Sequence, residues 1–559
     1  MKLIECVPNF SEGRDSALIK QITDEIINVN GSMLLDVDMG ADTNRTVVTF
    51  IGTPESVVDS AFKAIKKASE LIDMRTHKGE HPRMGATDVC PLIPVNGVTI
   101  EECVEISRRL AKRVADELSI PVYLYEYSAS EEKRKSLAII REGEYEGFGE
   151  KIKRAEWKPD FGKPEFNVKS GATVIGVRDF LIAYNVNLNT RDAKLATAVA
   201  NAIREKGSAK KDANGKILKN EKGETLFAPG RLKECRAIGW YIDMYKVAQI
   251  SINLTNWKVT PPHIAYETAA EEAAKRGLMA TGSELVGLIP KDALIEAGEY
   301  FLRKQGKSCG VPERELIHIA VKSLGLDHLY PFDIDKKVIE YAYKKNSGKE
   351  YLADMRIKDF CDELSTDSPA PGGGSVAALN GAIAASLVSM VASLTYMKKG
   401  YEKHSAEANE IAAKAQRIKD SFLSLIDDDT EAFNNYMAAF KMPKKTEEEA
   451  KKRDALLEEA TKAAIEVPLK TMEEVLASLS IMERISVIGN VNSISDAGVA
   501  AINAEGCAEG AYMNVLINLK NLSDKEYKDK KMKQADKMLE DVKKSCSKVK
   551  ETVYTAIQQ

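Results

Sequence analysis

Two of the six histidines in this 559-residue sequence, His77 and His81, lie within five residues of each other in a polar segment at 75–88. The segment also holds two arginines, a lysine, a glutamate and two glycines, and Pro82 with the glycines restricts its backbone shape. Because the ordinary pKa of histidine is ~6.5, a histidine presented to a cleft by such a loop could act as a general base. The plainer interpretation is a solvated basic turn at the end of a helix.

A second candidate region is glycine-rich and lies in the C-terminal half. Residues 371–375 read Pro-Gly-Gly-Gly-Ser and precede an uncharged apolar stretch. A glycine-rich entry to a helix lets backbone amides approach a ligand, and the helix N-terminus favours negative charge. The pattern therefore indicates an anion or ligand cradle, with a packing or turn device as the alternative.

Three successive aspartates, Asp427, Asp428 and Asp429, stand between two apolar pairs in the same half. Successive helical residues are rotated by ~100°, so at least one of these carboxylates should face the apolar side of a helix. Partial burial would raise its pKa, as a general acid requires. The alternative is a solvated helix face.

Sheet and helix patterns alternate through the first three-fifths of the chain. Short β-branched or apolar runs at 33–38, 46–51, 180–188, 237–243 and 248–254 predict strands, and apolar residues at helical spacing predict helices at 54–72, 192–204 and 334–343. This order is typical of α+β layers. We expect two such subdomains, at 1–180 and 181–343.

The composition changes after a polar, charge-rich run at 344–350, which we interpret as a linker. From 351 to 559 nearly every segment has helical periodicity, most clearly 446–465 and 523–557, which predicts an all-α helical bundle. Residues 376–397 carry no charge and approach the length of a membrane span. They are rich in Ala, Ser and Gly, so we expect a tightly packed bundle centre and no membrane partner.

The overall composition excludes some classes of function. The 80 basic and 84 acidic residues nearly balance, with a formal net charge of −4, which argues against a nucleic-acid partner. The eight cysteines are scattered without a Cys-x-x-Cys pair, so free thiols in a reducing compartment are expected, and no metal-ligand spacing is present. The N-terminal residues lack the apolar segment of a signal peptide. We therefore predict a cytoplasmic protein.

The first three-fifths of the sequence resembles the glutamate formimidoyltransferase family. The resemblance rests on ordered segments at 5–13 (ECVPNFSEG), 36–38 (DVD), 43–46 (TNRT), 77–85 (HKGEHPRMG), 121–125 (PVYLY), 160–162 (DFG), 171–173 (GAT), 229–232 (PGRL) and 238–241 (IGWY). The second half is similar to formimidoyltetrahydrofolate cyclodeaminases at 368–378 (SPAPGGGSVAA), 427–433 (DDDTEAF) and 514–519 (NVLINL). The order of the halves is that of the bifunctional formimidoyltransferase-cyclodeaminase family.

That resemblance implies two successive reactions. The formimino group of N-formimino-L-glutamate would pass to N5 of tetrahydrofolate, and the product would cyclise to 5,10-methenyltetrahydrofolate with loss of ammonia. Tetrahydrofolate would be a co-substrate and would carry a polyglutamate tail, and no metal is expected. The resemblance also implies a homo-oligomer with cyclodeaminase sites between subunits. It points to histidine degradation, with purine fermentation as the other pathway left open by the sequence.

Carried over by position, the resemblance makes His81 the base of the transfer and Asp38 the carboxylate that orients the amidine. The stretch 162–171 would bind folate; its predicted binding residues are Gly162, Lys163, Lys169, Ser170 and Gly171, with the lysines attracting the folate tail. Asp429 would be the general acid that expels ammonia, next to the ligand loop Gly372, Gly373, Gly374 and Ser375.

Two alternatives to this function remain open from the sequence. The polar segment 207–226 is longer than in the shortest family members, and a long loop beside a site can act as a lid. It could alter the donor, so that N-formyl-glutamate replaces formimino-glutamate. The other alternative is a folate-binding scaffold that has lost turnover, although the presence of both His81 and Asp429 argues against it.

Overall fold

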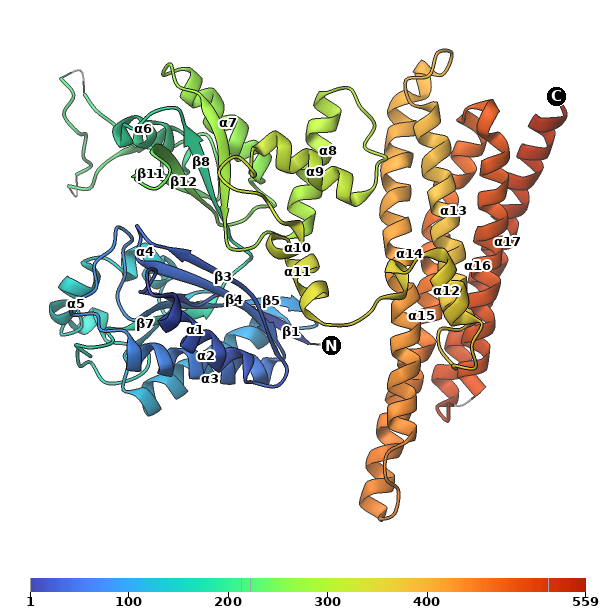
Figure 1. Ribbon diagram of the computed structural model, residues 1–559, viewed down its shortest axis with the longest axis horizontal. Coiled ribbons are helices and arrows are strands. Elements are labelled where there is room, and N and C mark those ends of the chain that lie inside the picture. Colours follow the sequence, from blue (N-terminus) through green and yellow to red (C-terminus); the bar gives the residue numbers. More distant parts are fainter. Residues whose placement is uncertain (1, 213, 222, 521) are drawn as a thin grey trace. The chain divides into compact units, whose positions relative to one another are not determined.

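The computed structural model describes residues 2–212, 214–221, 223–520 and 522–559. It divides into two compact units, which are described separately (Figure 1). The first unit runs to Ala297 and includes Ile317–Lys349, and the second consists of Gly298–Leu316 and Glu350–Gln559. The first unit has the sheets and the second is helical, so the predicted multidomain fold class is confirmed.

The N-terminal part of the first unit is built on a seven-stranded mixed sheet. Its strands are β1 (Leu3–Cys6), β2 (Asn9–Phe10), β3 (Ser32–Gly40), β4 (Arg45–Gly52), β5 (Thr87–Asn96), β6 (Val122–Glu126) and β7 (Thr173–Val177). β1 and β2 both pair with β4 on one side and β5 on the other. β3 pairs with β4 antiparallel, whereas β7 pairs in parallel with β5 and β6.

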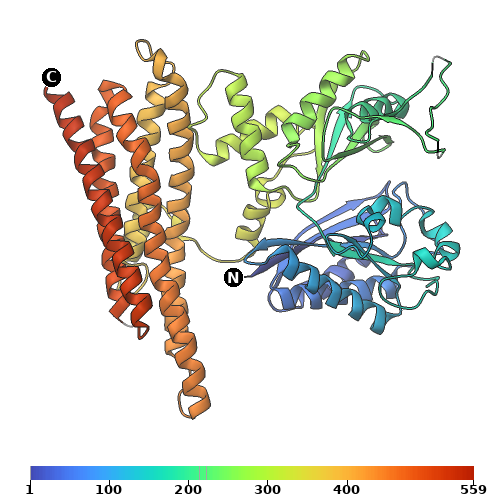
Figure 2. The same cartoon turned by 180° about the vertical axis from the view of Figure 1, so that it is seen from behind.

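Helices α1 (Ser16–Ile27), α2 (Pro54–Leu71) and α3 (Ile100–Leu118) lie together on one face of this sheet (Figure 2). Side chains at alternate strand positions, such as Ile4, Cys6 and Phe50, are completely buried under the helices. Successive strand residues point to opposite faces. The residues between these core positions therefore occupy the face without helices, which leaves that face available for a site.

The C-terminal part of the first unit has a four-stranded antiparallel sheet in the order β11 (Cys235–Ile242), β12 (Val247–Leu254), β8 (Ile182–Leu188), β13 (Ala280–Val286). Helices α6 (Ala193–Ile203) and α7 (Pro262–Ala274) cover it, and α6 approaches Gly239 so closely that a Cβ there would lie 2.0 Å from the Thr197 amide nitrogen. At the base of the polar segment 207–226, β9 (Ser208–Ala209) pairs antiparallel with β10 (Phe227–Ala228); residues 213 and 222 lie outside the described residues.

One predicted helix is divided in the structure. Residues 334–343 were expected to be continuous, but α10 (Ile334–Lys337) ends before Val338 and α11 (Ile339–Asn346) begins after it. Val338 is extended and forms a parallel bridge with Ile289. The pairing takes precedence over local helical periodicity. The remaining helices of this region are α4 (Leu137–Ile140), α5 (Glu144–Lys151), α8 (Lys291–Lys304) and α9 (Glu313–Leu324).

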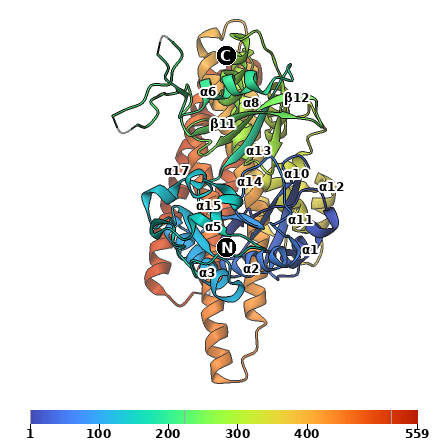
Figure 3. The same cartoon turned by 90° about the vertical axis from the view of Figure 1, so that its left-hand side faces the viewer.

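The second unit is a bundle of long helices preceded by the short α12 (Ile357–Leu364). They are α13 (Gly373–Thr395), α14 (Ser405–Phe440), α15 (Glu447–Ile488), α16 (Ile494–Lys520) and α17 (Lys525–Gln558). α14 and α15 extend beyond the other helices at one end (Figure 3). Helix α15 continues through Pro468, so it is longer than the predicted 446–465.

Helix α13 lies in the core of this bundle, in contact with α14 and α16. Its length and composition would allow it to cross a membrane, but 61% of its most apolar window is buried within the chain. Small residues explain the close packing: a Cβ at Gly381 would lie 2.4 Å from the Phe422 ring. Packing within the bundle therefore accounts for the apolar composition of α13.

Candidate active sites

A cavity of about 630 Å³ lies between the two sheets of the first unit, on the faces that carry no helices. Alternate positions of the first sheet line it, and so do alternate positions of the second. The lining residues from β1, β2 and β4 are Glu5, Asn9, Arg45, Val47 and Thr49, with Val7 between β1 and β2, and those from β8, β12 and β13 are Ala183, Asn185, Gln249, Ser251, Asn253, Glu284 and Val286. Both His81 and Asp38 also line this cavity, so the structure brings these two predicted catalytic residues together.

His81 is partly buried, and its Nδ1 lies 2.8 Å from the carbonyl oxygen of Pro82. If Nδ1–H donates to that carbonyl, the lone pair of the neutral ring is on Nε2. Burial lowers the pKa of His81 to about 3, and the positive charges of the nearby Arg45 and Arg141 contribute to this decrease. The imidazole is therefore neutral at physiological pH, with a lone pair on the nitrogen that does not face Pro82.

His77, the other histidine of this loop, has both ring nitrogens engaged. Its Nε2 lies 2.9 Å from the Asn44 carbonyl oxygen, and its Nδ1 accepts a hydrogen bond of 3.1 Å from Arg83 Nε. Burial lowers the pKa of His77 as well. His77 thus helps to hold the loop, whereas His81 retains a nitrogen for chemistry.

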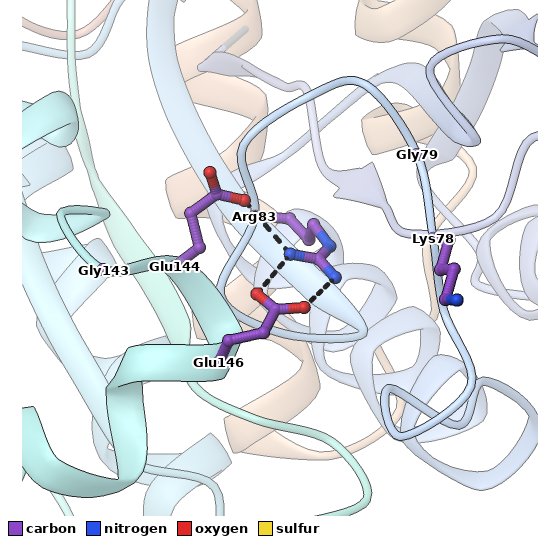
Figure 4. Close-up of a pocket in the computed structure, with 6 residues that line it drawn as sticks. All are labelled: Lys78, Gly79, Arg83, Gly143, Glu144 and Glu146. Atoms are coloured by element: carbon purple, nitrogen blue, oxygen red, sulfur yellow. Dashed lines mark hydrogen bonds and ion pairs between the residues drawn. The ribbon is translucent and has the colours of Figure 1, made fainter.

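Arg83 anchors the same loop to α5 (Figure 4). Its guanidinium forms a two-pronged pair with Glu146 at 2.7 and 2.8 Å, and Nη1 also donates to Glu144 at 3.1 Å. Only 6% of the Arg83 side chain is exposed, and its Nη2 donates to the His77 carbonyl. A surface pocket of about 460 Å³ adjoins this cluster and is lined also by Lys78 and Gly79. A two-pronged arginine–carboxylate pair fixes geometry, so Arg83 limits the positions open to His81.

A fully buried carboxylate, Asp88, holds two arginines at the cavity. Its Oδ2 accepts hydrogen bonds from Arg45 at 2.7 Å and from Arg141, and its Oδ1 accepts from the Met84 amide. Although burial alone would raise the pKa of Asp88, the Arg141 and Arg45 guanidiniums hold it well below its usual range. Two cations share one anion, so the cluster keeps a net positive charge toward the cavity, where a substrate carboxylate could bind.

Asp38 joins the two parts of the first unit. Its Oδ2 accepts a hydrogen bond of 3.0 Å from the Gly287 amide and lies 3.2 Å from Lys337 Nζ. Lys337 also pairs with Asp36 at 3.3 Å, and burial raises the pKa of the Asp36 carboxyl. The break after α10 places Lys337 at this point. Asp38 is therefore oriented by groups almost 250 and 300 positions away in the chain.

The second sheet supplies a polar network around Glu284. The Glu284 carboxylate accepts hydrogen bonds from Tyr245 at 2.8 Å, Gln249 at 3.0 Å and Asn185 at 3.1 Å. Gln249 in turn accepts from the Trp240 indole at 3.1 Å. Such a connected network holds several donors and acceptors in fixed positions for a polar ligand.

The predicted folate stretch 162–171 lies elsewhere. Gly171 packs against the backbone of the histidine loop, where a Cβ would lie 2.0 Å from the Met84 carbonyl oxygen, and the Ser170 carbonyl accepts from the Ala86 amide. Lys163 is exposed, and the Lys169 ammonium donates to the Glu70 carbonyl. Within the described part of the chain, none of Gly162, Lys163, Lys169, Ser170 and Gly171 lines the cavity of His81. Their role in folate binding stays a prediction.

In the second unit, Asp429 of α14 lies at the N-terminus of α13. Ser375 Oγ is 3.2 Å from Asp429 Oδ2 and 2.9 Å from the Ile426 carbonyl oxygen. Burial raises the pKa of Asp429, and hydrogen bonds from the side chain and backbone of Ser375 act in the opposite direction. The structure thus brings the predicted aspartate to the predicted glycine loop.

The glycines of this loop are not equivalent. A Cβ on Gly374 would lie 2.1 Å from Asp429 Oδ1, so only glycine admits the carboxylate at this distance. A Cβ on Gly373 would be 3.7 Å from the side-chain Nδ2 of Asn514, and one on Gly372 would be 3.8 Å from the Pro369 carbonyl oxygen. Of the other aspartates, Asp427 is buried and accepts from the Leu352 amide at 2.7 Å, whereas Asp428 is exposed. At least one aspartate faces inward, as the periodicity predicted.

Family models match nearly the whole chain. A model described as "Formiminotransferase domain, N-terminal subdomain" matches residues 3–178, "Formiminotransferase domain" matches 183–344, and "Formiminotransferase-cyclodeaminase" matches 356–537. A formimidoyltransferase-cyclodeaminase from Rattus norvegicus is 42% identical over 97% of this chain and 97% of its own length. The chain belongs to the formimidoyltransferase-cyclodeaminase family.

Two further relatives each match one half of the chain. A glutamate formimidoyltransferase from Thermoplasma acidophilum is 44% identical over 55% of this chain and 94% of its own length. A methenyltetrahydrofolate cyclohydrolase from Methylorubrum extorquens is 36% identical over 36% of this chain and 97% of its own length. The resemblance noted from the sequence is confirmed, and each half has relatives that consist of little else.

Sequence reasoning missed several groups in the formimidoyltransferase cavity. Arg141 and Lys337 stand in segments with no distinctive motif, and Glu284 is an isolated acid in a strand. Glu5 and Arg45 lie within the motifs that carried the resemblance, but a motif does not tell which residue faces a cavity. Strand alternation offered a signal for Glu5, because Ile4 and Cys6 on either side are apolar. In the described residues, no cluster of three His, Cys, Asp or Glu side chains is arranged to hold a metal.

Proposed function

We propose that this chain transfers the formimino group from N-formimino-L-glutamate to tetrahydrofolate and then cyclises the product to 5,10-methenyltetrahydrofolate with release of ammonia. The first unit gives L-glutamate and 5-formimidoyl-tetrahydrofolate, and the second closes the ring. Family membership over 97% of the chain supports both reactions. The observation that carries the assignment to two sites is that His81 and Asp38 share one cavity, whereas Asp429 lies at the glycine loop of a different unit.

In the transfer step, N5 of tetrahydrofolate attacks the amidine carbon of the donor. His81 accepts the N5 proton through its free ring nitrogen, and Asp38 orients the amidine. The cavity of about 630 Å³ is within the usual range for small-molecule sites. Arg45, Arg141 and Arg178 at its wall can bind the carboxylates of the donor.

In the second step, N10 attacks the same carbon and ammonia leaves. Ammonia departs easily only when its nitrogen is protonated, so a general acid is needed. Asp429 fits this role because burial raises the pKa of its carboxyl while Ser375 fixes its orientation. The amides at the start of α13 favour an anionic ligand group beside it.

The folate is a polyglutamylated co-substrate in this proposal, and Lys163 and Lys169 attract its tail. The site of action is the cytoplasm, within histidine degradation. The family resemblance supports the pathway, and eight free cysteines agree with a reducing compartment. Measuring turnover with mono- and pentaglutamyl folate, and with Lys163→Gln, tests the tail: a variant that loses the preference for the longer substrate supports it.

The chain acts as a homo-oligomer, with a second copy on the exposed apolar face of α13 and α16. That face carries Ile383, Met390 and Leu394 on α13 and Val499, Ile502, Met513 and Ile517 on α16, all at least 39% exposed. The residues are 7 and 4 positions apart on α13 and 3, 11 and 4 positions apart on α16. At about 100° per residue, these spacings bring the residues of each helix to one side of it. A large exposed apolar patch marks an interaction site.

Sedimentation of Ile502→Glu tests this association. We expect the parent to sediment as an oligomer and the variant to dissociate and lose ammonia release, while formimino transfer continues. Leu456→Glu, at a 37% exposed position on α15, serves as the matched control. A parent that is monomeric and fully active in both reactions would overturn the proposal of self-association.

The two-site assignment is tested by mixing protein with tetrahydrofolate and formimino-glutamate and following methenyl absorbance and ammonia together. His81→Ala should abolish both signals from this mixture but retain ammonia release from supplied 5-formimidoyl-tetrahydrofolate. Asp429→Ala should still release glutamate but form neither ammonia nor methenyl product. Asp38→Asn should slow glutamate release, and with it ammonia release from this mixture, but leave ammonia release from supplied 5-formimidoyl-tetrahydrofolate unchanged.

The same assay separates the alternatives, which the family relationship does not favour. If formyl-glutamate yields formyl-folate and formimino-glutamate does not react, the donor is formyl-glutamate. Tight folate binding without turnover of either donor would indicate a scaffold. Because one relative of the second half is a methenyltetrahydrofolate cyclohydrolase, 10-formyltetrahydrofolate should also be measured as a product.

A further inference from the structure

Glu5 occupies a central position in the wall of the transferase cavity. It belongs to β1, which pairs with β4 on one side and β5 on the other. Ile4 and Cys6 point to the helices and are completely buried. Strand alternation therefore turns Glu5 to the opposite face, where it lines the same cavity as His81 and Asp38.

The carboxyl of Glu5 is buried but incompletely satisfied. Only 1% of the residue is exposed, and no described group lies within hydrogen-bonding distance of its Oε2. Buried carboxyls are ordinarily paired, and an unpaired one is costly to fold. A purely structural role does not explain an acid at this position, because an amide or apolar side chain could be buried there at a lower free-energy cost.

Burial favours the protonated form of the Glu5 carboxyl. Burial raises the pKa of Glu5 to about 8. The nearby Arg178 guanidinium acts to lower this pKa, and the Glu340 carboxylate raises it further. Arg178 also lines this cavity, and its Nη1 donates to the Asp179 carbonyl at 2.9 Å. The other titratable or charged groups that line this cavity are Asp38, Asp42, Arg45, His81, Tyr125, Glu126, Arg141, Arg236, Tyr245, Glu284, Tyr330 and Lys337.

Formimino transfer needs a proton donor as well as a base. The glutamate nitrogen leaves from a tetrahedral carbon, and an amine leaves readily only when its nitrogen gains a proton. His81 is neutral and its Nδ1 is turned to the Pro82 carbonyl, so it does not supply that proton, and Asp38 Oδ2 accepts hydrogen bonds from Gly287 and Lys337. The hydroxyls of Tyr245 and Tyr330 are already turned to Glu284.

We propose that Glu5 is the general acid of formimino transfer, which donates its carboxyl proton to the departing glutamate nitrogen. The inference rests on the proposed transferase function. N5 forms a bond to the amidinium carbon, the C=N pair moves to the amidinium nitrogen, and His81 takes the N5 proton. The lone pair of the former amidinium nitrogen then re-forms the C=N double bond, and the bond between the carbon and the glutamate nitrogen breaks. Its electron pair stays on the glutamate nitrogen, which takes the Glu5 proton, and proton return from His81 to Glu5, directly or through solvent, restores both groups.

Glu5→Gln in the full chain tests this role, with glutamate release from formimino-glutamate and tetrahydrofolate measured from pH 5.5 to 9.5. General acid catalysis contributes roughly 10²–10⁴-fold, so we expect kcat for transfer to fall by at least about 100-fold while the donor KM changes little. The parent should lose activity as pH rises through about 8, and the residual activity of the variant should lack this decline. Glu150→Gln, at a highly exposed position on α5, is the matched control.

Ammonia release from supplied 5-formimidoyl-tetrahydrofolate, a reaction of the other unit, shows whether the variant chain is intact. A kcat within threefold of the parent, or an unchanged alkaline decline, would overturn the role of Glu5 while leaving the transferase function in place. A parent that transfers nothing would instead overturn the proposed function. If Glu5→Gln fails to fold, the test uses the unsubstituted protein by itself. A single-turnover rate of formimino transfer that stays constant up to pH 9.5 would contradict the proposal.

Discussion

The two candidate sites handle a buried acid in different ways. The cavity of the first unit is enclosed by two sheets, and its acids Asp88 and Asp38 are paired with arginine, lysine and hydrogen-bond donors. The site of the second unit has one carboxyl, Asp429, held by Ser375 at the start of a helix with small residues around it. Charge pairing orients the first site, whereas close approach to a helix N-terminus orients the second.

This difference predicts how each site tolerates change. A site built from many paired side chains can lose one partner and still keep part of its geometry, although an unpaired buried charge is costly. A site that depends on glycine leaves no room for an added methyl group. The three predictions below test this contrast.

The largest effect is expected at Gly374. Alanine there would place a Cβ 2.1 Å from Asp429 Oδ1, so the aspartate or the helix start must move. We expect ammonia release from supplied 5-formimidoyl-tetrahydrofolate to fall at least about 100-fold, since small displacements of a catalytic group are costly. Gly372→Ala is the control, because its Cβ meets no described atom closer than 3.8 Å. Equal activity of the two variants would remove the argument from close approach.

An intermediate effect is expected at Arg83. Lysine keeps the charge but cannot form the two-pronged pair with Glu146 or keep the contact with His77 in the same geometry. We expect kcat for formimino transfer to fall about tenfold with ammonia release unchanged, because the loop of His81 loses its anchor. Lys78→Gln, an exposed change in the same loop, should leave transfer unaffected. Full activity of Arg83→Lys would show that the loop is positioned by other contacts.

The last prediction concerns stability and pH at Glu5, and its effect is confined to part of the pH range. The folded-state pKa, about 8, lies above the ordinary value of 4.5, so the folded state binds the proton more tightly. The stability contribution is therefore complete below about pH 4.5 and is lost as pH rises toward 8. Between pH 6 and 8 the parent should lose about 2 kcal/mol more of its free energy of unfolding than Glu5→Gln loses.

Urea unfolding of the full chain, followed by tryptophan fluorescence, measures this difference. All three tryptophans, Trp157, Trp240 and Trp257, belong to the first unit, so the signal reports that unit. Parallel pH dependence of the two proteins would show that Glu5 does not titrate in this range. A variant that is more stable at pH 8 yet slower in transfer would be the expected signature of a buried group kept for function.

Much of the fold could be predicted because its signals are local. Strand runs at 33–38 and 46–51 match β3 and β4, and the helical spacing at 54–72 matches α2 within one residue. The predicted helix at 334–343 was wrong at Val338, because its pairing with Ile289 depends on a segment almost 50 residues earlier. Local periodicity cannot contain that information.

The sequence by itself determined the α+β and helical parts, the family, and the loops that carry His81, Asp38 and Asp429. Only the tertiary structure decided which histidine has a nitrogen to spare, that Lys337 reaches Asp38 across 299 positions, and that Glu5 faces a cavity without a partner for Oε2. Periodicity and motifs are properties of neighbouring residues, whereas desolvation and pairing depend on what the completed fold brings together.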